Sequence, residues 1–353
     1  GLIGGSIAKR LRILHKDLVI IATAGHAATI EAAYKEGLTD NASPCELSDF
    51  YDCDYIFLCT PVQKNMEYLR LLKGHVCDRC IITDVGSVKT DIHREVTALG
   101  MEAQFIGGHP MAGSERIGFA NSKAGLLENA YYILAPAPQV PAAKIAEFQG
   151  LVTSMGAIPL QVESQKHDYV TAAVSHLPHI VAAALVHLVQ DHDDAQGLMK
   201  SIAAGGFKDI TRIASSSPVM WEQICMTNTV NISRLLQDYI DALGIVQKEL
   251  QEHDSASLYT FFDGARAYRD SFIDAGSGPI KKDYSIRLDI PDEAGSIAAV
   301  STLLALNNIS IKNIGIVHNR EAQEGVLRIE FYEEDSITKA IQLLNRRGYV
   351  THI

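Results

Sequence analysis

The sequence predicts an α/β protein in three parts: a doubly wound domain over residues 1–163, an all-helical domain over 164–275 and a small βαββαβ domain over 284–353. Three observations support this organisation. Strand-like and helical runs alternate through the first part, and Ala, Leu, Ile and Val recur at helical spacing in the second. The third part has the strand and helix order of a ferredoxin-like fold.

The first part is expected to hold a parallel sheet with helices on both faces. Its first helix should end near Leu14, and Pro61 should stop a buried strand. The predicted strands cover 18–22, 54–60 and 80–84 and lie near 105, 132 and 158, and the predicted helices cover 27–36 and the stretch from the turn at 86 to Ala98.

The second part should be a helical bundle over 167–192, 195–204 and 219–252. Pro178 lies in or near the start of a helix, where it removes an amide donor and kinks the axis. So much apolar helix with little sheet to cover it predicts that the bundle also buries a partner subunit, most simply in a homodimer. A polar linker over 274–279 should end this part.

The tail reads as a separate unit with two helices and four strands. The expected strands cover 284–290, 309–317, 326–332 and 349–353, and the expected helices cover 292–306 and 336–345. This order is that of a ferredoxin-like fold.

Composition limits the classes of function. The 353 residues carry a formal net charge of −11, which disfavours nucleic acid and anionic membranes as partners. The sequence contains no run of about 18 unbroken apolar residues, so no membrane span is predicted. The CxxC pair Cys77 and Cys80 lacks the second pair of a zinc site, so we expect reduced thiols in a cytoplasmic protein.

The glycine-rich start resembles the end of a nucleotide-binding turn. Gly1 and Gly4 fit the last two glycines of G-x-G-x-x-G, with the first glycine and the preceding strand absent from the given sequence. Such a turn lets backbone amides at a helix N-terminus contact a pyrophosphate. The cofactor-binding candidates are therefore Gly1, Leu2, Ile3 and Gly4, with a plain glycine turn as the alternative.

The nicotinamide cofactor is expected to be NAD, with NADP left open. A ribose-binding acid about 20 residues after the glycines is missing from positions 20–30, and only His26, not an arginine, stands near for a 2′-phosphate. Thr60 and Pro61 would lie beneath the cofactor at the end of their strand.

Three polar turns carry the candidate chemistry, at residues 83–89, 107–115 and 175–179. Each candidate also has an ordinary structural interpretation. Ser87 could cap the next helix, His109 could bond to backbone in a loop, and Arg212 could be a surface ion-pair residue. His176 and His179, one helical turn apart, could bind metal, but no carboxylate stands at helpful spacing and no metal site is expected.

Taken together, the motifs closely resemble the prephenate dehydrogenase family of the bacterial tyrosine pathway. The runs that carry the resemblance are Gly1–Ser6, Asp84–Lys89, Gly108–Ser114, His167–Asp168, Ser175–His179, Phe207–Ala214 and Met220–Trp221. It covers residues 1 to about 252, and the tail from 284 resembles an ACT domain, an amino-acid-sensing unit. The absent first glycine and ribose acid are departures that affect the cofactor details.

The resemblance implies oxidative decarboxylation of prephenate to 4-hydroxyphenylpyruvate. His109 is the candidate proton acceptor, and Ser87 would orient the hydroxyl or His109 beside the cofactor. Arg212 matches the family's ring-carboxylate position, and its planar fork suits bidentate contact. His176 and His179 would line the substrate wall, and Lys89 and Ser114 are weaker candidates.

The tail is expected to bind L-tyrosine as a feedback inhibitor at Asp292 and Gly295, where the first strand of an ACT domain turns into its first helix. A purely structural or dimerising tail is the alternative. For the whole chain, arogenate dehydrogenase is the nearest rival, because the ring chemistry is the same. A β-hydroxyacid dehydrogenase with lysine-centred chemistry and an inactive amino-acid sensor are the other two.

Overall fold

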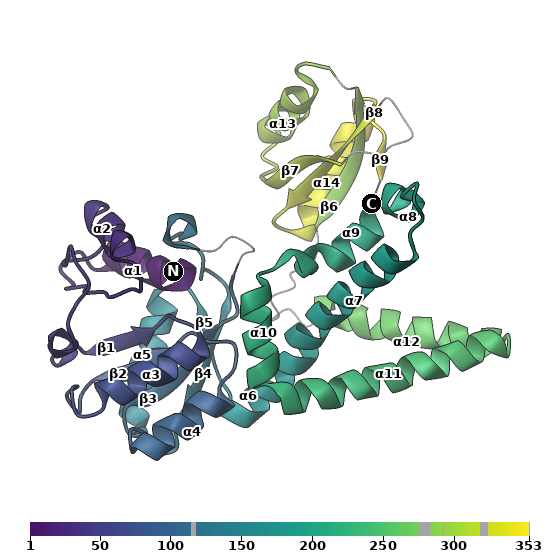
Figure 1. The fold of residues 1–353 in the computed structure, drawn as a ribbon. Helices are drawn as coiled ribbons and strands as arrows, with labels where there is room; N and C mark the ends of the chain where they lie inside the picture. The colour runs from purple at the N-terminus through teal and green to yellow at the C-terminus, as the bar shows by residue number, and fades with distance from the viewer. Residues whose placement is uncertain (114–117, 275–283, 292, 318–323, 353) are drawn as a thin grey trace. The chain divides into compact units, whose positions relative to one another are not determined.

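The computed structural model describes residues 1–113, 118–274, 284–291, 293–317 and 324–352 (Figure 1). The chain forms two compact units, Gly1–Leu258 and Tyr259–Ile353. The candidates Ser114 and Asp292, and the predicted linker beyond Asp274, lie outside the described residues.

The first unit contains a five-stranded sheet in the order β1-β2-β3-β4-β5. Its strands are β1 (Tyr55–Leu58), β2 (Ile81–Asp84), β3 (Phe105–Pro110), β4 (Tyr131–Pro136) and β5 (Ile158–Gln161). The doubly wound prediction is confirmed, but an all-parallel sheet is wrong, because β4 runs antiparallel to β3. A parallel neighbour needs a crossover helix, and the described part of this connection holds only a 3₁₀ turn, Phe119–Asn121.

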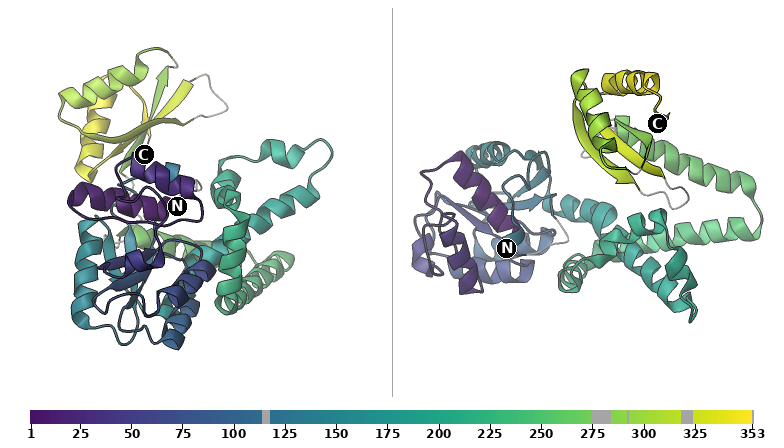
Figure 2. Two further views of the ribbon diagram at one scale, coloured as in Figure 1. Left: turned by 60° about the vertical axis from the view of Figure 1, so that its left-hand side comes forward. Right: turned by 90° about the horizontal axis from the view of Figure 1, so that it is seen from above.

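Helices lie on both faces of this sheet (Figures 1 and 2). They are α1 (Leu2–Leu14), α2 (Ala27–Lys35), α3 (Val62–Leu72), α4 (Thr90–Leu99) and α5 (Ala142–Ser154), with a 3₁₀ turn at Leu47–Phe50. All four residues of β2 are buried, as expected for a strand covered on both faces. Ile82, Phe105, Leu134 and Phe148 are fully buried in the core cluster between these layers.

The strand predicted over residues 18–22 is not formed. Its backbone bonds instead to the side chains of two residues after α2: Ile20 N donates to Asp40 Oδ2 at 2.7 Å and Ala22 N to Asn41 Oδ1 at 2.9 Å. In a doubly wound sheet this segment would pair with a strand before the first glycine. Here the side chains that follow α2 satisfy these amides instead.

The helical part begins with one continuous helix that contains a π-helical turn. α6 (Ser164–Thr171), the turn Ala172–His176 and α7 (Leu177–His192) follow without a break. Pro178 lies just after the π turn, where the wider turn accommodates the missing amide donor. Pro178 is thus the second residue of α7, as predicted for a position in or near the start of a helix, and the irregularity before it is a π-helical turn.

The remaining helices are shorter than predicted, and two of them are additions. They are α8 (Leu198–Ile202), α9 (Gly205–Thr211), a 3₁₀ turn (Arg212–Ser215), α10 (Pro218–Thr227) and α11 (Thr229–Gln251). The single helix expected over 219–252 is interrupted at Asn228, whose φ of −123° is not helical. Sequence reasoning predicted neither α9 nor α12 (Ser255–Asp274).

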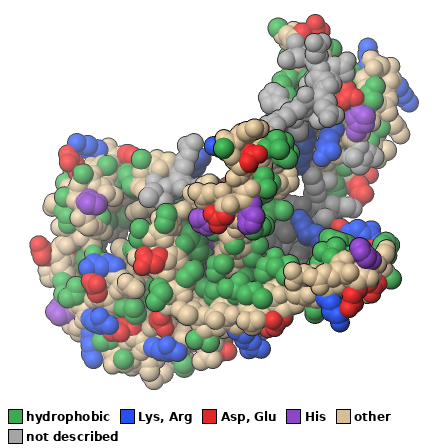
Figure 3. Space-filling model, turned by 45° about the vertical axis from the view of Figure 1, so that its right-hand side comes forward, with side chains coloured by type: hydrophobic (Ala, Val, Ile, Leu, Met, Phe, Trp, Pro, Cys, Tyr) green, Lys and Arg blue, Asp and Glu red, His purple; other side chains and the backbone are tan. Residues whose placement is uncertain are grey.

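Much of the apolar surface of these helices is uncovered in the single chain. The stretch Ser164–His192 is long and apolar enough to cross a membrane by length and composition, and 17% of its most apolar window is buried. Its polar residues His167 and Asp168 are nevertheless buried against the sheet part. Figure 3 shows hydrophobic side chains gathered on one face of the molecule. This surface agrees with the predicted burial of a partner subunit.

The second unit holds a four-stranded antiparallel sheet in the order β7-β8-β6-β9. Its elements are β6 (Ser285–Pro291), α13 (Ser296–Leu306), β7 (Ile311–Val317), β8 (Glu324–Phe331), α14 (Glu334–Arg346) and β9 (Thr351–His352). Ile286, Leu288, Leu304 and Leu344 are fully buried in its own core. The predicted ferredoxin-like order is confirmed.

Candidate active site

Asp84 joins the first polar turn to the end of the neighbouring strand. Its carboxylate accepts hydrogen bonds from Gly86 N at 2.9 Å and from Gly108 N at 3.1 Å, and it is paired with the ammonium of Lys89. Both charged side chains are completely buried. A Cβ on Gly108 would lie 2.4 Å from Asp84 O, so only glycine permits this close approach.

The buried ion pair sets the electrostatics beneath the turn. Burial lowers the pKa of Lys89, and the attraction of Asp84 opposes this effect. His93 lies one helical turn beyond Lys89, and its Nε2 has no hydrogen-bond partner among the described residues. Burial, with the charge of Lys89, lowers the pKa of His93 to about 4, so this imidazole is neutral near pH 7.

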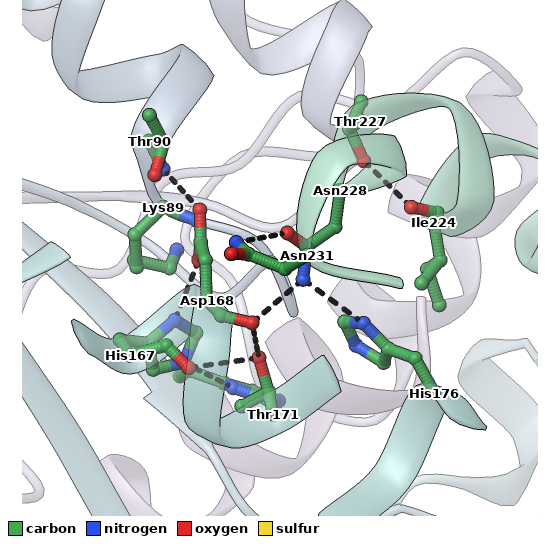
Figure 4. Close-up of polar contacts among 12 residues, drawn as sticks. Lys89, Thr90, His167, Asp168, Thr171, His176, Ile224, Thr227, Asn228 and Asn231 are labelled. Atoms are coloured by element: carbon green, nitrogen blue, oxygen red, sulfur yellow. Dashed lines mark hydrogen bonds and ion pairs between the residues drawn. The ribbon is translucent and has the colours of Figure 1, made fainter. Parts of the chain in front are cut away.

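Asp168, on α6, holds the N-terminus of α4 from a distance of 79 positions in the sequence. Its carboxylate accepts from Lys89 N and Thr90 N, each at 2.7 Å (Figure 4). These two amides belong to the end of α4 that has no intrahelical partners and carries the positive end of the helix dipole. α4 has no capping side chain of its own, so the alternative that Ser87 caps it is not realised.

His167 links the same carboxylate to His109. His167 Nδ1 lies 2.8 Å from Asp168 Oδ1, and His167 Nε2 lies 2.8 Å from His109 Nδ1. Burial would raise the pKa of Asp168, but the hydrogen bonds from His167, Thr90 and Lys89 together hold it below its usual value. Asp168 is therefore an ionised carboxylate that accepts from two backbone amides and from the imidazole of His167.

His109 is placed by β3, at the carboxyl end of the parallel pair β2 and β3. Its ring meets that of His167 edge-on, with the centroids 5.1 Å apart. Burial is the largest cause that lowers the pKa of His109 well below its ordinary value, and the neighbouring basic groups His167, Lys89 and His176 act in the same direction. The imidazole is thus a neutral acceptor at physiological pH.

A second group of rings lies on the helical wall. His179 stacks on Trp221 of α10 with the centroids 3.7 Å apart, and His176 meets the same indole edge-on at 6.0 Å. Asn228, at the break before α11, has its Nδ2 2.7 Å from Asp168 O and 3.2 Å from His176 Nδ1 (Figure 4). Burial lowers the pKa of His176 to about 4.

This wall carries buried donors that the described residues do not satisfy. The backbone oxygen of Asp168 can only accept, so the nearby atom of Asn228 is its amide nitrogen, which also donates to His176 Nδ1. The proton of the neutral His176 is therefore on Nε2. That nitrogen and Trp221 Nε1 are buried without a partner among the described residues.

Arg212 and Ser87 complete the predicted set. Arg212 begins the 3₁₀ turn after α9 and is exposed, and its charge contributes, after burial, to the lowered pKa of His179. The structure thus brings Arg212 to the same wall as His179. Ser87 is half-buried in the turn before Lys89, three positions beyond Asp84, the last residue of β2.

The cofactor candidates cluster where α1 begins. A Cβ on Gly4 would lie 3.0 Å from Cys59 Cβ, just after β1, while one on Gly1 would meet nothing within 4 Å. Gly4 therefore permits close helix–strand packing, and the start of the helix is open. The amides of Leu2, Ile3 and Gly4 belong to the first turn, where helices leave donors unpaired. These features fit a dinucleotide pyrophosphate.

Thr60 and Pro61 lie at the adjoining strand end. The hydroxyl of Thr60 donates to Asn65 Oδ1 at 2.6 Å, and Pro61 precedes the first residue of α3. In the second unit, Gly295 begins α13 with a φ of +101°, a conformation that favours glycine.

Sequence reasoning missed several residues of the network. Asp84, His167, Asp168 and Trp221 were used only as parts of motifs, and Asn228 was taken as helix interior. Asp84 could have been found as an acid at the end of a buried strand. The bonds of Asp168 and Asn228 join elements more than 50 positions apart, and no local pattern indicates them.

Comparison with known families and proteins places this geometry in context. Residues 7–159 match the nucleotide-binding domain of prephenate dehydrogenase, and residues 163–263 match its dimerization domain. The prephenate dehydrogenase of Bacillus subtilis (strain 168) is 36% identical over 350 residues, which span 99% of this chain and 94% of the relative. That of Lactococcus lactis subsp. cremoris (strain MG1363) is 32% identical over 98% of this chain and 96% of the relative.

Solved structures agree with this assignment. Prephenate dehydrogenase from A. aeolicus, in complex with hydroxyphenyl propionate and NAD+, is 28% identical and has a TM-score of 0.72 over 76% of this chain and 94% of its own. Synechocystis arogenate dehydrogenase is 29% identical, with a TM-score of 0.69 over 77% and 97%. The chain therefore belongs to the prephenate dehydrogenase family, and the predicted oxidoreductase class and dimerisation domain are confirmed.

Proposed function

We propose that this chain catalyses the NAD-dependent oxidative decarboxylation of prephenate to 4-hydroxyphenylpyruvate. The observation that carries the proposal is His109, a neutral imidazole at the end of β3 whose Nδ1 is held by His167. Its Nε2 has no hydrogen-bond partner among the described residues, and this atom is not fully buried. A basic nitrogen is thus accessible to a ligand hydroxyl.

In this reaction the protein has to position the substrate against the cofactor and transfer the hydroxyl proton. Prephenate and NAD+ give 4-hydroxyphenylpyruvate, CO2 and NADH, and the nicotinamide supplies the hydride acceptor when it is bound. His109 would take the ring hydroxyl proton as hydride leaves the same carbon. Loss of CO2 then makes the ring aromatic, and His109 can return its proton to the phenolate oxygen. Ser87, on the adjacent turn, would orient the hydroxyl or the imidazole.

The helical wall would hold the anionic groups of prephenate. Arg212 would bind the ring carboxylate, because its guanidinium can make two parallel hydrogen bonds. His176 offers a neutral Nε2–H donor, which suits a carboxylate or keto oxygen better than an ammonium group. This favours the keto side chain of prephenate, while the similarity to an arogenate dehydrogenase makes arogenate the second candidate.

The cofactor would bind with its pyrophosphate at Gly1–Gly4 and with the nicotinamide near Thr60, Pro61 and Ser87. NAD is favoured over NADP because positions 20–30, where a 2′-phosphate would lie, contain no arginine. Asp40 does not serve as the ribose acid in this conformation, since it accepts from Ile20 N and from Arg12.

We further propose that the enzyme is a cytoplasmic homodimer inhibited by L-tyrosine through its ACT-like unit. Support comes from the uncovered apolar helices, the dimerisation domain and the ferredoxin-like tail with Gly295 before α13. Titration of the full-length protein with L-tyrosine, followed by calorimetry and by activity, tests the regulation. The absence of both heat and inhibition would leave the tail a structural role.

The activity itself can be tested with four parallel assays of NADH or NADPH absorbance. They combine prephenate or L-arogenate with NAD+ or NADP+. We expect the highest kcat/KM for prephenate with NAD+. A higher value for arogenate would reassign the substrate, and no reduction in any assay would support the inactive sensor.

A further inference from the structure

His109, His167 and Asp168 form a short hydrogen-bonded chain whose proton positions follow from its buried end. Asp168 Oδ1 accepts from Lys89 N, and Asp168 Oδ2 accepts from Thr90 N, each at 2.7 Å. Backbone amides can only donate, so both carboxylate oxygens must accept. Hydrogen bonds donated to a carboxyl group favour its charged form, and here they hold the pKa of Asp168 below its usual value against the effect of burial, so the carboxylate is ionised. Asp168 is 1% exposed, so water does not replace these partners.

The next step concerns His167, which is 2% exposed. Its Nδ1 is 2.8 Å from Asp168 Oδ1, which also accepts from Lys89 N, so Nδ1 must carry the proton. We take this ring as neutral, so that Nε2 has a lone pair and can only accept. His109 Nδ1, at 2.8 Å from that nitrogen, must in turn be the protonated one. The second nitrogen of His109, Nε2, is left as a bare acceptor. A protonated His167 would instead donate to His109 Nδ1 and leave the proton of His109 on Nε2, and the spectra described below distinguish the two cases.

We propose that His167 and Asp168 are positioning residues that fix the tautomer of His109, so that its Nε2 is unprotonated and available to the substrate hydroxyl. The proposal rests on the function proposed for His109 and assigns a task to two residues outside the predicted site. The ionised Asp168 also stabilises the positive charge that His109 gains when it takes the proton, through two hydrogen bonds. Neither His167 nor Asp168 needs to touch substrate or cofactor.

Asp168 also connects these three hydrogen-bonded residues to the rest of the candidate active site. Asp168 caps α4, which directly follows the turn that contains Ser87. Its backbone oxygen accepts from Asn228, whose amide also orients His176 on the helical wall. The residue thus sets three features together: the start of α4, the tautomer of His109 and the orientation of His176.

Replacing His167 separates positioning from folding. His167→Leu removes the acceptor for His109 Nδ1–H. His167→Gln keeps it, because the amide can donate to Asp168 and accept from His109. Thr171→Val is the matched control: it is a buried residue of the same helix whose hydroxyl bonds only to the backbone oxygens of His167 and Asp168. Each variant should bind NAD+ with wild-type affinity if it is folded.

We expect His167→Leu to lower kcat by about 10- to 1000-fold, as when an orienting partner of a catalytic histidine is lost. KM for prephenate and NAD+ should change less than threefold, and His167→Gln should recover most of kcat. A His167→Leu enzyme that binds NAD+ normally and keeps wild-type kcat overturns the proposal. So does a loss of kcat that His167→Gln shares in full.

A spectroscopic readout decides the tautomer without any turnover. Two-bond 1H–15N correlation spectra of the full chain with 15N-labelled histidine, assigned with His109→Asn, show which ring nitrogen carries the proton. We expect Nδ1–H for His109 in wild type and in Thr171→Val, and loss of this preference in His167→Leu. Nε2–H in the wild type overturns the proposal. If the wild type turns over no prephenate but shows Nδ1–H, the proposed function fails while the tautomer assignment stands.

Discussion

The two halves of the candidate active site differ in how their polar groups are paired. At the edge of the sheet, Asp84 meets a buried lysine and two amides, and Asp168 meets two amides and an imidazole. On the helical wall, His176 Nε2 and Trp221 Nε1 are buried without partners among the described residues. The two carboxylates of the first half are thus fixed before binding, as the partner of a catalytic base requires, and His93 Nε2 of that half is buried without a partner among the described residues. The second half offers donors to a ligand.

The elements that carry the two halves also differ in how far they are buried. Every residue of β2 is buried, whereas Ala182 is the buried residue of α7 in the single chain. The sheet half is therefore a closed core. The helical half, in contrast, leaves apolar surface and buried donors to be covered by a ligand or a partner.

The largest effect should come from breaking the buried ion pair. Lys89→Met leaves the carboxylate of Asp84 buried without its cation, which should lower the free energy of unfolding by about 3–5 kcal/mol. Urea unfolding followed by circular dichroism measures this. Lys64→Met, which breaks an exposed pair with Glu67, is the control and should cost less than about 1 kcal/mol. Equal effects of the two variants would contradict a dry, preorganised sheet half.

Arg212→Ala tests the ligand-binding role of the helical half. Loss of a bidentate carboxylate contact should raise KM for prephenate about 10- to 100-fold, equivalent to about 1.5–3 kcal/mol, with little change in kcat. Lys208→Ala, at an exposed position one turn earlier, is the control. A fall in kcat without a rise in KM would show that Arg212 does not anchor a carboxylate.

The free energy of unfolding should fall as the pH falls, because both halves of the candidate site contain a buried histidine. The pKa of His93 and of His176 is lowered to about 4, whereas an unfolded histidine titrates near 6.5. Between about pH 6.5 and 4 the unfolded chain therefore binds more protons, and the free energy of unfolding falls by about 3 kcal/mol per histidine over this range. His93→Leu should flatten the dependence measured by urea unfolding. An unchanged slope would contradict burial of a neutral His93.

The pH profile of kcat/KM should show a small but diagnostic shift. His109 must be neutral to accept a proton, and its pKa lies well below the ordinary value. Activity should therefore persist below about pH 6.5, the usual histidine pKa, and decline only at more acidic pH. Steady-state rates in constant-ionic-strength buffers measure this. An acidic limb at pH 6.5 or above, in a stable enzyme, would oppose the assignment.

Local sequence signals predicted the elements that depend on local chemistry. Alternating strands and helices, the glycine turn at Gly1 and Gly4 and the tail order all follow from periodicity and turn residues. The strand predicted at 18–22 is not formed, because the amides of Ile20 and Ala22 bond to the side chains of Asp40 and Asn41. The antiparallel β4 was also missed, because strand direction depends on the path of the connection and not on the strand's own residues.

The site was predictable in part for the same reason. Ser87, His109, His176 and His179 stand in short motifs, so their residue types reveal them. Asp168 works through amides 78 and 79 positions away, and Asn228 works because the helix breaks at its position. Such contacts are set by the packing of α6 against α4, and sequence spacing does not show them.

Turnover of prephenate by His109→Asn tests the central claim most directly. If His109 accepts the hydroxyl proton, kcat should fall by about 10²- to 10⁴-fold while the dissociation constant for NAD+ changes less than twofold. A variant that keeps wild-type kcat, with prephenate and NAD+ saturating, would contradict the account.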